Sequence, residues 1–357
     1  MDEELRRRID SLDVDGRARL NRLFEIRVEH GQTDPPEAMA TWLQATFGSV
    51  EAVRRQTIVK VTNRATLEAT IFAPLRAHRP LNGTAASSSL SGEISVTLGD
   101  PFCDPEANTP ADLFGRVRGE RILSGANAAM ADRHHGVLVF DTHDPLAFDA
   151  RLVADLFETG RAWAERAREA DPAAVNYLLL WNCLWRAGGS IIHGHAQALL
   201  GAGSHYAGPE RFRRDAAAYR IAHGIELAAD LVASHQDLGL AINAGPGATI
   251  VAHLTPVKEH EVLVVGALGA DERDPDFVRA VSRVLVALRD RVGVRAFNLA
   301  MWRPPLSDAE GWDPMPPIVR LVDRGDPFSR PSDIGAMELY GTPIVSADPW
   351  ELIAALG

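Results

Sequence analysis

The chain has 357 residues, a formal net charge of −11 and 46% apolar residues, which is the composition of a globular protein. The acidic balance argues against a nucleic-acid partner, because no block of Lys and Arg offsets it. Only Cys103 and Cys183 are present, so we expect no disulfide framework and favour a reducing cytoplasm. No apolar run has the length of a membrane span or the pattern of a signal peptide, so we expect no membrane partner.

The first 55 residues are predicted to form a helical N-terminal extension. The apolar positions that recur at helical spacing there are Leu5, Ile9, Leu12, Leu20, Leu23, Phe24 and Val28. Two β-patterned stretches follow between Thr57 and Pro74, which predicts a hairpin about Asn63-Arg64. The Ser-, Gly- and Ala-rich residues 81–93 are expected to be a loop.

Further along, strands alternate with helical patterns in a repeating order. Strands are predicted at 136–140, 176–181 and through the following Ala198-Leu199-Leu200-Gly201, with a helix over 146–170. A long helix over 208–235 precedes three more strands, a helix over 274–292 and a strand at Phe297. The repeated order hints at an internal duplication. We therefore expect an α+β fold in which two related halves, residues 56–205 and 206–357, pack antiparallel sheet against helices.

The segment from Ser190 to Gln197, Ser-Ile-Ile-His-Gly-His-Ala-Gln, is the most informative part of the chain. In extended backbone its two histidines and Gln197 would point to one face. A neutral imidazole such as His195 can attack phosphorus near neutral pH, and a glutamine can donate to a phosphoryl oxygen without adding charge. Gly188 and Gly189 would let an anion approach the backbone. A His-x-His pair alone is weak evidence, so the neighbouring residues carry the hypothesis.

The spacing Asn182-x5-Gly188-x-Ser190-x2-His193-x-His195-x-Gln197 resembles the active-site signature of galactose-1-phosphate uridylyltransferases, a branch of the histidine-triad (HIT) superfamily. That family usually has proline where this chain has Gly194. Histidine-triad hydrolases instead have a third histidine where this chain has Gln197. The likeness extends over roughly residues 57–355. Its other elements are the Arg76-x-x-Arg79-Pro end of the hairpin, Asp100-Pro-Phe-Cys103, the Asn127 loop, the strand leading to His143 and a late Gly-x-Glu-like segment.

The resemblance implies a HIT-like fold and nucleotidyl transfer by double displacement. His195 would form a covalent nucleotidyl-histidine, with Gln197 stabilising charge on the phosphoryl oxygens. The residues expected to contact the nucleotide or its phosphates are Arg76, Arg79, Asn127, Asn182, Gly188, Gly189 and Ser190. The alternatives are surface charges for the two arginines and a simple turn residue for Asn127. His134 and His135 are interpreted as a solvated pair, and Trp181 and Trp185 as core residues.

The resemblance also implies a structural zinc site. The matching positions are Asp100, Cys103, His143 and His193, with a carboxylate where relatives have a thiolate, which zinc accepts. Some family members have lost this metal, so the sequence leaves zinc open. The second-half metal site of some relatives needs a late His-x-His, which residues 315–320 lack.

The substrates expected from the resemblance are a nucleotide sugar and, as acceptor, a sugar 1-phosphate or inorganic phosphate. The base, the sugar and the acceptor stay open, because the segments that bind sugar in the family match poorly here. Two alternatives also stay open, a dinucleoside polyphosphate phosphorylase or hydrolase and a non-catalytic nucleotide-binding protein. A second copy of the chain is a further candidate partner, as a homodimer.

Overall fold

The structure, a computed structural model, describes residues 1–79 and 89–357. Its N-terminal part contains α1 (Asp2–Ser11), α2 (Val14–Leu23), β1 (Phe24–Gln32), η1 (Glu37–Met39), α3 (Ala40–Phe47), α4 (Val50–Arg54), β2 (Arg55–Asn63), β3 (Ala69–Phe72) and η2 (Pro74–His78). Part of the loop expected over 81–93 lies outside the described residues. Its last residues form the start of a helix instead, α5 (Leu90–Val96), which begins after the N-cap Ser89.

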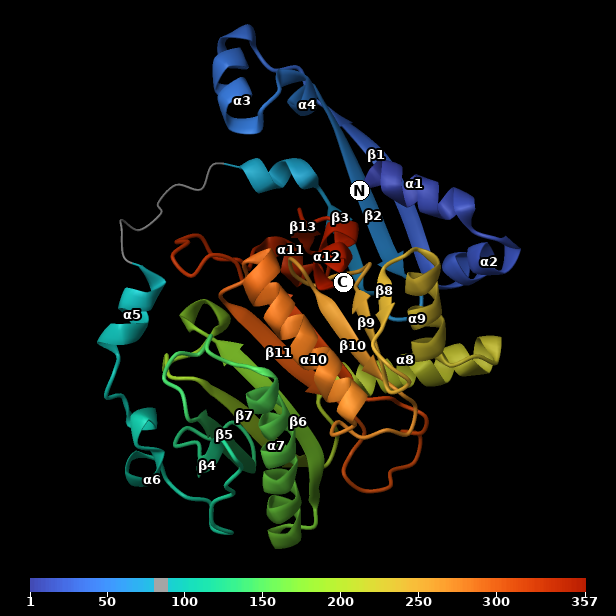
Figure 1. The fold of residues 1–357 in the computed structure, drawn as a ribbon. Helices are drawn as coiled ribbons and strands as arrows, with labels where there is room; N and C mark the ends of the chain where they lie inside the picture. The colour runs from blue at the N-terminus through green and yellow to red at the C-terminus, as the bar shows by residue number, and fades with distance from the viewer. Residues whose placement is uncertain (80–88) are drawn as a thin grey trace.

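Residues 24–32, expected to be helical, form the strand β1. This prediction is wrong because Phe24, Ile26 and Val28 also alternate with charged residues, the period of a half-buried strand. β1 pairs antiparallel with β2 along its whole length, and the predicted β2–β3 hairpin is confirmed. The short strand β13 (Ile344–Val345) adds to β3 from the C-terminal end, which completes a four-stranded sheet with the order β1-β2-β3-β13. Figure 1 shows β1 and β2 as a long blue ribbon carrying α3 and α4 at its far end.

The rest of the chain is built on one nine-stranded sheet with the order β4-β5-β7-β6-β11-β12-β10-β9-β8. Its first-half elements are β4 (Ile122–Ala126), β5 (His134–Phe140), α7 (Ala150–Ala170), β6 (Ala174–Cys183) and β7 (His195–Ala202). Its second-half elements are β8 (Ala241–Asn243), β9 (Ala248–Ala252), β10 (Val262–Gly266), α10 (Pro275–Ala287), η5 (Leu288–Val292), β11 (Phe297–Trp302) and β12 (Ile318–Asp323).

The strands of the two parts of the sheet follow a similar order, and the predicted duplication stays a prediction. The first half runs strand, strand, helix, strand, strand, and the second half has the same order after one additional strand, β8. About the β6–β11 pair, the order β4-β5-β7-β6 is mirrored by β9-β10-β12-β11, with β8 added at the edge. β6 and β11 are antiparallel neighbours, with Asn182 opposite Asn298 and Trp181 opposite Leu299. This pairing joins the halves into one sheet, so residues of the second half lie beside strands of the first.

The main core lies between the sheet and the helices α7 and α10, which pack against each other and on one face of the sheet (Figure 1). α7 begins at the N-cap Asp149, a few residues later than predicted, where the Asp149 carboxylate accepts from the backbone N–H of Leu152. Trp163 and Trp181 are fully buried, which confirms Trp181 as a core residue. Trp181 contacts the rings of Phe140, Phe148 and Phe297 edge-on.

The helix expected over 208–235 is interrupted at Gly224, whose φ of 69° ends the first helix in the left-handed region. The remaining elements are η3 (Pro101–Cys103), α6 (Pro105–Asn108), η4 (Trp185–Ala187), α8 (Ala207–His223), α9 (Leu227–Asp237), α11 (Ala336–Leu339) and α12 (Pro349–Leu356). Within the described residues, no helix combines the length and the apolar character needed to cross a bilayer.

Candidate functional site

His195 is the first residue of β7, where it pairs with Val139 of β5. Its Nδ1–H donates to the backbone carbonyl of His193 at 2.8 Å, so the lone pair of the neutral ring lies on Nε2. Nε2 has no hydrogen-bond partner within residues 1–79 and 89–357. The residue is 7% exposed, and burial lowers the pKa of the imidazole despite that carbonyl. The ring therefore offers a neutral, oriented nitrogen nucleophile.

Gln197 lies two residues further along β7, on the same face as His195. Its Oε1 is 2.8 Å from Nε2 of His135, and Nδ1 of His135 accepts from the backbone N–H of Ala131 at 3.0 Å. His135 is only 4% exposed, so its interpretation as a solvated residue is wrong. The ring is buried because β5 lies between β4 and β7, a position that sequence periodicity alone does not specify.

Asn182 lies near the end of β6, and its Oδ1 is 2.7 Å from Nδ2 of Asn298 on the neighbouring strand β11. The same Nδ2 group donates to the carbonyl of Ala187 at 2.8 Å, and Oδ1 of Asn298 accepts from Arg324. Arg324 is in turn paired with Asp333. The first-half candidate Asn182 is thus held by residues of the second half, and no sequence pattern connects these residues with it.

Gly188 and Gly189 form the turn that returns the chain toward β7. Gly188 has a φ of 92°, which favours glycine. A Cβ at Gly189 would lie 2.9 Å from the carbonyl oxygen of Asn182 and 3.0 Å from that of Leu184. Both glycines are therefore required by the backbone path itself. Ser190, the next residue, is exposed.

A small apolar cluster lies beside His195, made of Phe102, Val137 and Val139 with Ile191 packed against it. The Phe102 ring meets the His195 imidazole nearly edge-on, with centroids 5.0 Å apart. This cluster offers apolar side chains next to the His195 ring, and the sequence did not single it out.

Asn127 contacts the same ring nitrogen of His135 as Gln197 does. Its backbone N–H donates to the carbonyl of His135 at 2.7 Å, and its Nδ2 is 3.2 Å from Nε2 of that ring. His195 and Gln197 thus lie on β7, and Asn127, in the loop between β4 and β5, meets Gln197 at the His135 ring.

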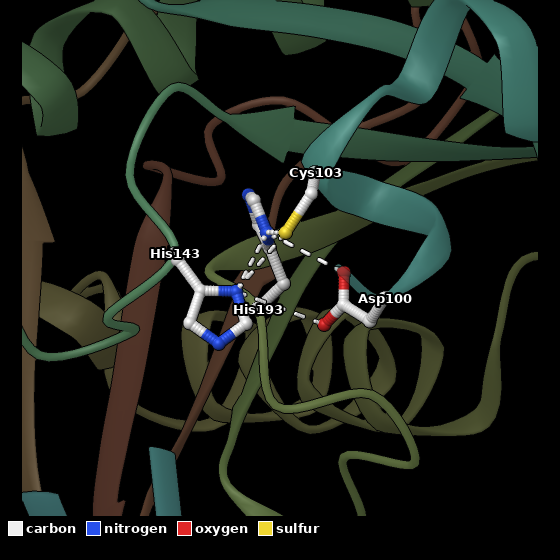
Figure 2. Close-up of side chains that lie close together, drawn as sticks. All are labelled: Asp100, Cys103, His143 and His193. Carbon is white, nitrogen blue, oxygen red and sulfur yellow. Dashed lines mark hydrogen bonds and ion pairs between the residues drawn. The ribbon is translucent and has the colours of Figure 1, made fainter. Parts of the chain in front are cut away.

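Asp100, Cys103, His143 and His193 form a compact cluster of metal-ligating atoms, all within 4.8 Å of one another. Figure 2 shows the four side chains pointing toward a common centre. The Cys103 sulfur is 3.4 Å from Nδ1 of His143 and 3.6 Å from Nδ1 of His193, and the two Nδ1 atoms are 3.2 Å apart. The Asp100 oxygens lie 3.8 Å and 3.6 Å from the same nitrogens. The side chains predicted as zinc ligands are thus together.

The surrounding hydrogen bonds fit a cation at this centre. Nε2 of His193 donates to the carbonyl of Phe140 at 2.9 Å, and Nε2 of His143 donates to that of Ile94 at 3.0 Å, so both Nδ1 lone pairs point inward. Oδ2 of Asp100 is buried without a hydrogen-bond partner in the described residues. Two lone pairs, a thiol and a carboxylate facing one point are the donors that zinc prefers. The cluster is compatible with zinc.

Arg76 and Arg79 are exposed and line a cavity of about 270 Å³ together with Arg186, Lys258 and Arg324. No hydrogen bond within the described residues joins either arginine to the histidine segment. Arg186 belongs to the turn just before Gly188 and donates to the carbonyls of Arg324 and Ser329. The predicted phosphate contact of Arg76 and Arg79 stays a prediction.

No protein-family model matches the sequence, and no curated protein matches it significantly. Solved structures do match. An ADP-glucose phosphorylase from Arabidopsis thaliana superposes with a TM-score of 0.64 at 17% identity, covering 84% of this chain and 98% of its own. The chain has the galactose-1-phosphate uridylyltransferase-like fold. A GalT-like protein from Arabidopsis thaliana gives 0.57 at 16% identity, covering 72% and 90%, and a uridylyltransferase gives 0.56 at 16%, covering 83% and 96%.

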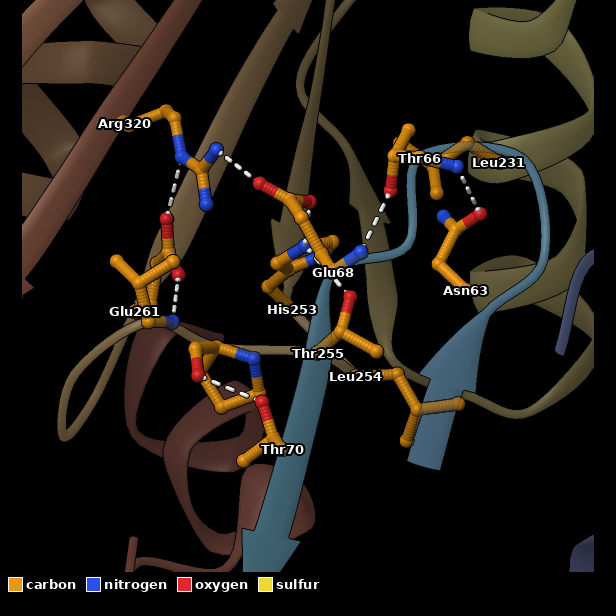
Figure 3. A network of polar contacts seen from close by, with 12 residues as sticks. Asn63, Thr66, Glu68, Thr70, Leu231, His253, Leu254, Thr255, Glu261 and Arg320 are labelled. Atoms are coloured by element: carbon orange, nitrogen blue, oxygen red, sulfur yellow. Dashed lines mark hydrogen bonds and ion pairs between the residues drawn. The ribbon is translucent and has the colours of Figure 1, made fainter. Parts of the chain in front are cut away.

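In the second half of this uridylyltransferase-like fold, a buried ion-pair network surrounds Arg320 of β12 (Figure 3). Nε of Arg320 donates to Glu261 at 2.6 Å and Nη1 donates to Glu68 at 2.5 Å, while Oε2 of Glu68 is 3.4 Å from Nε2 of His253. Burial opposes the charge on Arg320, but the attraction of the two carboxylates outweighs it and raises the pKa. The network ties the β2–β3 turn to β12.

Proposed function

We propose that the protein is a nucleotidyltransferase that moves a nucleoside monophosphate from a nucleotide sugar to a sugar 1-phosphate or inorganic phosphate, through a nucleotide covalently held on His195. The observation that carries the proposal is the His195 ring itself. Its Nδ1–H is committed to the His193 carbonyl, and its Nε2 is free beside the Gln197 amide on the same face of β7.

In the first step, Nε2 of His195 attacks the α-phosphorus and an N–P bond forms. The bond from that phosphorus to the bridging oxygen breaks, and the oxygen leaves with the sugar 1-phosphate. In the second step, an oxygen of the acceptor phosphate attacks the same phosphorus and the N–P bond breaks, which restores neutral His195. Inorganic phosphate as acceptor yields a nucleoside diphosphate, and a sugar 1-phosphate yields a new nucleotide sugar.

The neighbouring residues take the roles that their positions allow. Gln197, Ser190 and the backbone of Gly188 and Gly189 would stabilise charge on the phosphoryl oxygens. The nucleoside would lie on the apolar cluster of Phe102, Val137, Val139 and Ile191, next to Asn127. Asn182 would position the phosphate, with Arg76 and Arg79 holding the phosphate beyond it.

Asp100, Cys103, His143 and His193 would hold a structural zinc ion. When bound, the ion would fix the loop before β7 rather than take part in the transfer. Its connection to chemistry is the His193 carbonyl, which accepts from Nδ1 of His195. Fixing His193 therefore orients the nucleophile and keeps its lone pair on Nε2.

The test is to trap the intermediate. Incubation with an α-³²P-labelled nucleoside diphosphate sugar without acceptor should leave label on the wild-type chain and none on His195→Asn. The linkage should be acid-labile and base-stable, as a histidine phosphoramidate is. Initial-rate plots should be parallel, as in ping-pong kinetics. Intersecting kinetics with no trapped label from UDP-, ADP- or GDP-sugars would contradict the proposal. Label from dinucleoside polyphosphates alone would instead favour the polyphosphate phosphorylase.

A further inference from the structure

We infer that His135 and Asn298 are positioning residues that turn the side-chain amides of Gln197 and Asn182 so that both NH₂ groups face a phosphoryl group at His195. The inference rests on the proposed function, because it describes how that site receives the phosphoryl oxygens. It concerns two residues that do not touch the substrate and act only through their neighbours.

The first chain of hydrogen bonds starts at a backbone N–H, which can only donate. The backbone N–H of Ala131 donates to Nδ1 of His135 at 3.0 Å, and this places the proton of the neutral ring on Nε2. The Asn127 NH₂ group, whose Oδ1 accepts from the Ala129 N–H, also faces Nε2, but at 3.2 Å it is further from that nitrogen than the Gln197 oxygen is. That Nε2–H lies 2.8 Å from Oε1 of Gln197, which must be the accepting oxygen. The Gln197 NH₂ group is therefore directed away from His135, and it has no acceptor within the described residues.

The second chain reaches the site from the other half of the molecule. Arg324 has only donors and gives one to Oδ1 of Asn298, so the Asn298 NH₂ group is the one that contacts Ala187 and Asn182. It donates to Oδ1 of Asn182 at 2.7 Å. The Asn182 NH₂ group is therefore the free end of that amide.

The strand register places the two amides around the nucleophile. Gln197 pairs with Leu180 across β6 and β7, and Asn182 lies two residues along β6 from Leu180, on the same face. His195 lies two residues before Gln197 on that face. Two uncharged NH₂ donors, each with one orientation, thus share the face of the sheet on which His195 lies. Their orientation is preformed, which is the condition under which such donors stabilise developing charge.

The chain offers matched variants at His135. His135→Gln keeps an NH group near the Nε2 position and so can still donate to Gln197. His135→Asn keeps an acceptor near the Nδ1 position, for the Ala131 N–H, but cannot reach Gln197. We expect His135→Asn to lower kcat by about 10²-fold with little change in KM, as for loss of a transition-state donor. We expect His135→Gln to retain most of the wild-type kcat. In a Gln197→Ala background, His135→Asn should have almost no further effect.

Asn298→Asp tests the second chain, because aspartate still pairs with Arg324 but has no NH₂ to give. We expect a loss of kcat that disappears in an Asn182→Ala background. Equal losses in His135→Asn and His135→Gln, or losses that add fully to those of Gln197→Ala and Asn182→Ala, would overturn the inference. Thermal melts of every variant would identify a loss that comes from unfolding.

A readout without activity separates this inference from the proposed function. In ¹⁵N-histidine-labelled wild-type protein, His135 should be in the Nε2–H form, and its ring N–H signal should shift in Gln197→Ala. An Nδ1–H form would overturn the inference even in an active enzyme. A second outcome is a wild-type protein that has the expected tautomer but transfers no nucleotide. This result would contradict the proposed function. It would also overturn the positioning role, because the oriented amides would then have no reaction to serve.

Discussion

Zinc removal tests the cluster of Asp100, Cys103, His143 and His193 directly, and the structure supplies the magnitude. The Cys103 sulfur and the two Nδ1 atoms are 3.2 to 3.6 Å apart, and each Nδ1 lies 3.6 or 3.8 Å from one of the two Asp100 oxygens. A tetrahedron with edges of this size has its centre about 2.2 Å from each corner, and zinc bonds to nitrogen, oxygen and sulfur are about 2.0–2.3 Å long. The sulfur and the two nitrogens therefore need little movement to bind zinc, and an Asp100 oxygen within 4.8 Å of them is available as the fourth ligand.

Binding to the folded chain alone stabilises it by about 4 kcal/mol when free zinc is 1,000 times its dissociation constant. The unfolding entropy of a chain of this size is about 0.75 kcal/mol/K, so the melting temperature should rise by ~5 °C. We expect this shift in calorimetry of untagged, chelator-treated protein titrated with zinc. It should be absent in Cys103→Ala combined with His143→Ala, where two ligands are lost.

Asp100→Cys is the informative counterpart. A thiolate binds zinc more strongly than a carboxylate, so this variant should hold zinc against chelator concentrations that strip the wild type. Metal analysis of the purified chains gives the stoichiometry. No bound zinc and no thermal shift in the wild type, or one zinc per chain that survives in the Cys103→Ala and His143→Ala double variant, would refute the four-ligand site.

Three further predictions concern packing, phosphate binding and pH. Gly194→Ala should lower the free energy of unfolding by about 1–3 kcal/mol in urea titrations, because the new Cβ would lie 2.8 Å from the Phe140 ring and 3.0 Å from the Thr142 carbonyl. Gly31→Ala, where the nearest atom to the new Cβ is at 3.6 Å, is the control. Equal stabilities of the two variants would contradict the close packing at Gly194. Arg76→Ala and Arg79→Ala should each raise the KM for the nucleotide sugar by about tenfold or more, since a charge-assisted hydrogen bond contributes about 1.5–3 kcal/mol, and unchanged KM values in both would remove the arginines from the site. Burial, followed by repulsion from His253, lowers the pKa of His235 to about 3, and its Nε2 accepts from the Leu254 N–H. Below about pH 6.5 the unfolded chain binds a proton on this histidine that the folded chain does not bind. The contribution of the neutral ring to stability is therefore complete above about pH 6.5 and is lost as the pH falls toward 3. His235→Asn should reduce the loss of stability between pH 6.5 and 5 by up to ~2 kcal/mol, and an unchanged pH dependence of stability would contradict the buried neutral ring.

The sequence by itself determined the chemistry-bearing segment and most of the elements around it. The spacing from Asn182 to Gln197 depends on residues close in the chain, whose local backbone sets their relative positions. The strand periodicity of β5 and β6 and the helical periodicity of α7 were likewise visible. Residues 24–32 were misread because Phe24 and Val28 fit both a helical and a strand period, and only pairing with β2 decides between them.

Only the tertiary structure decided what surrounds that segment. Asp100 and Cys103 meet His143 and His193 because η3 packs beside the start of β7, which no local pattern specifies. His135 is buried against Gln197 because β5 pairs with β7, and Asn298 reaches Asn182 because β6 and β11 join the two halves. These are contacts between strands far apart in the chain. Their register is set by the packing of the whole sheet on α7 and α10, since a shift of one residue would turn every buried side chain to the other face.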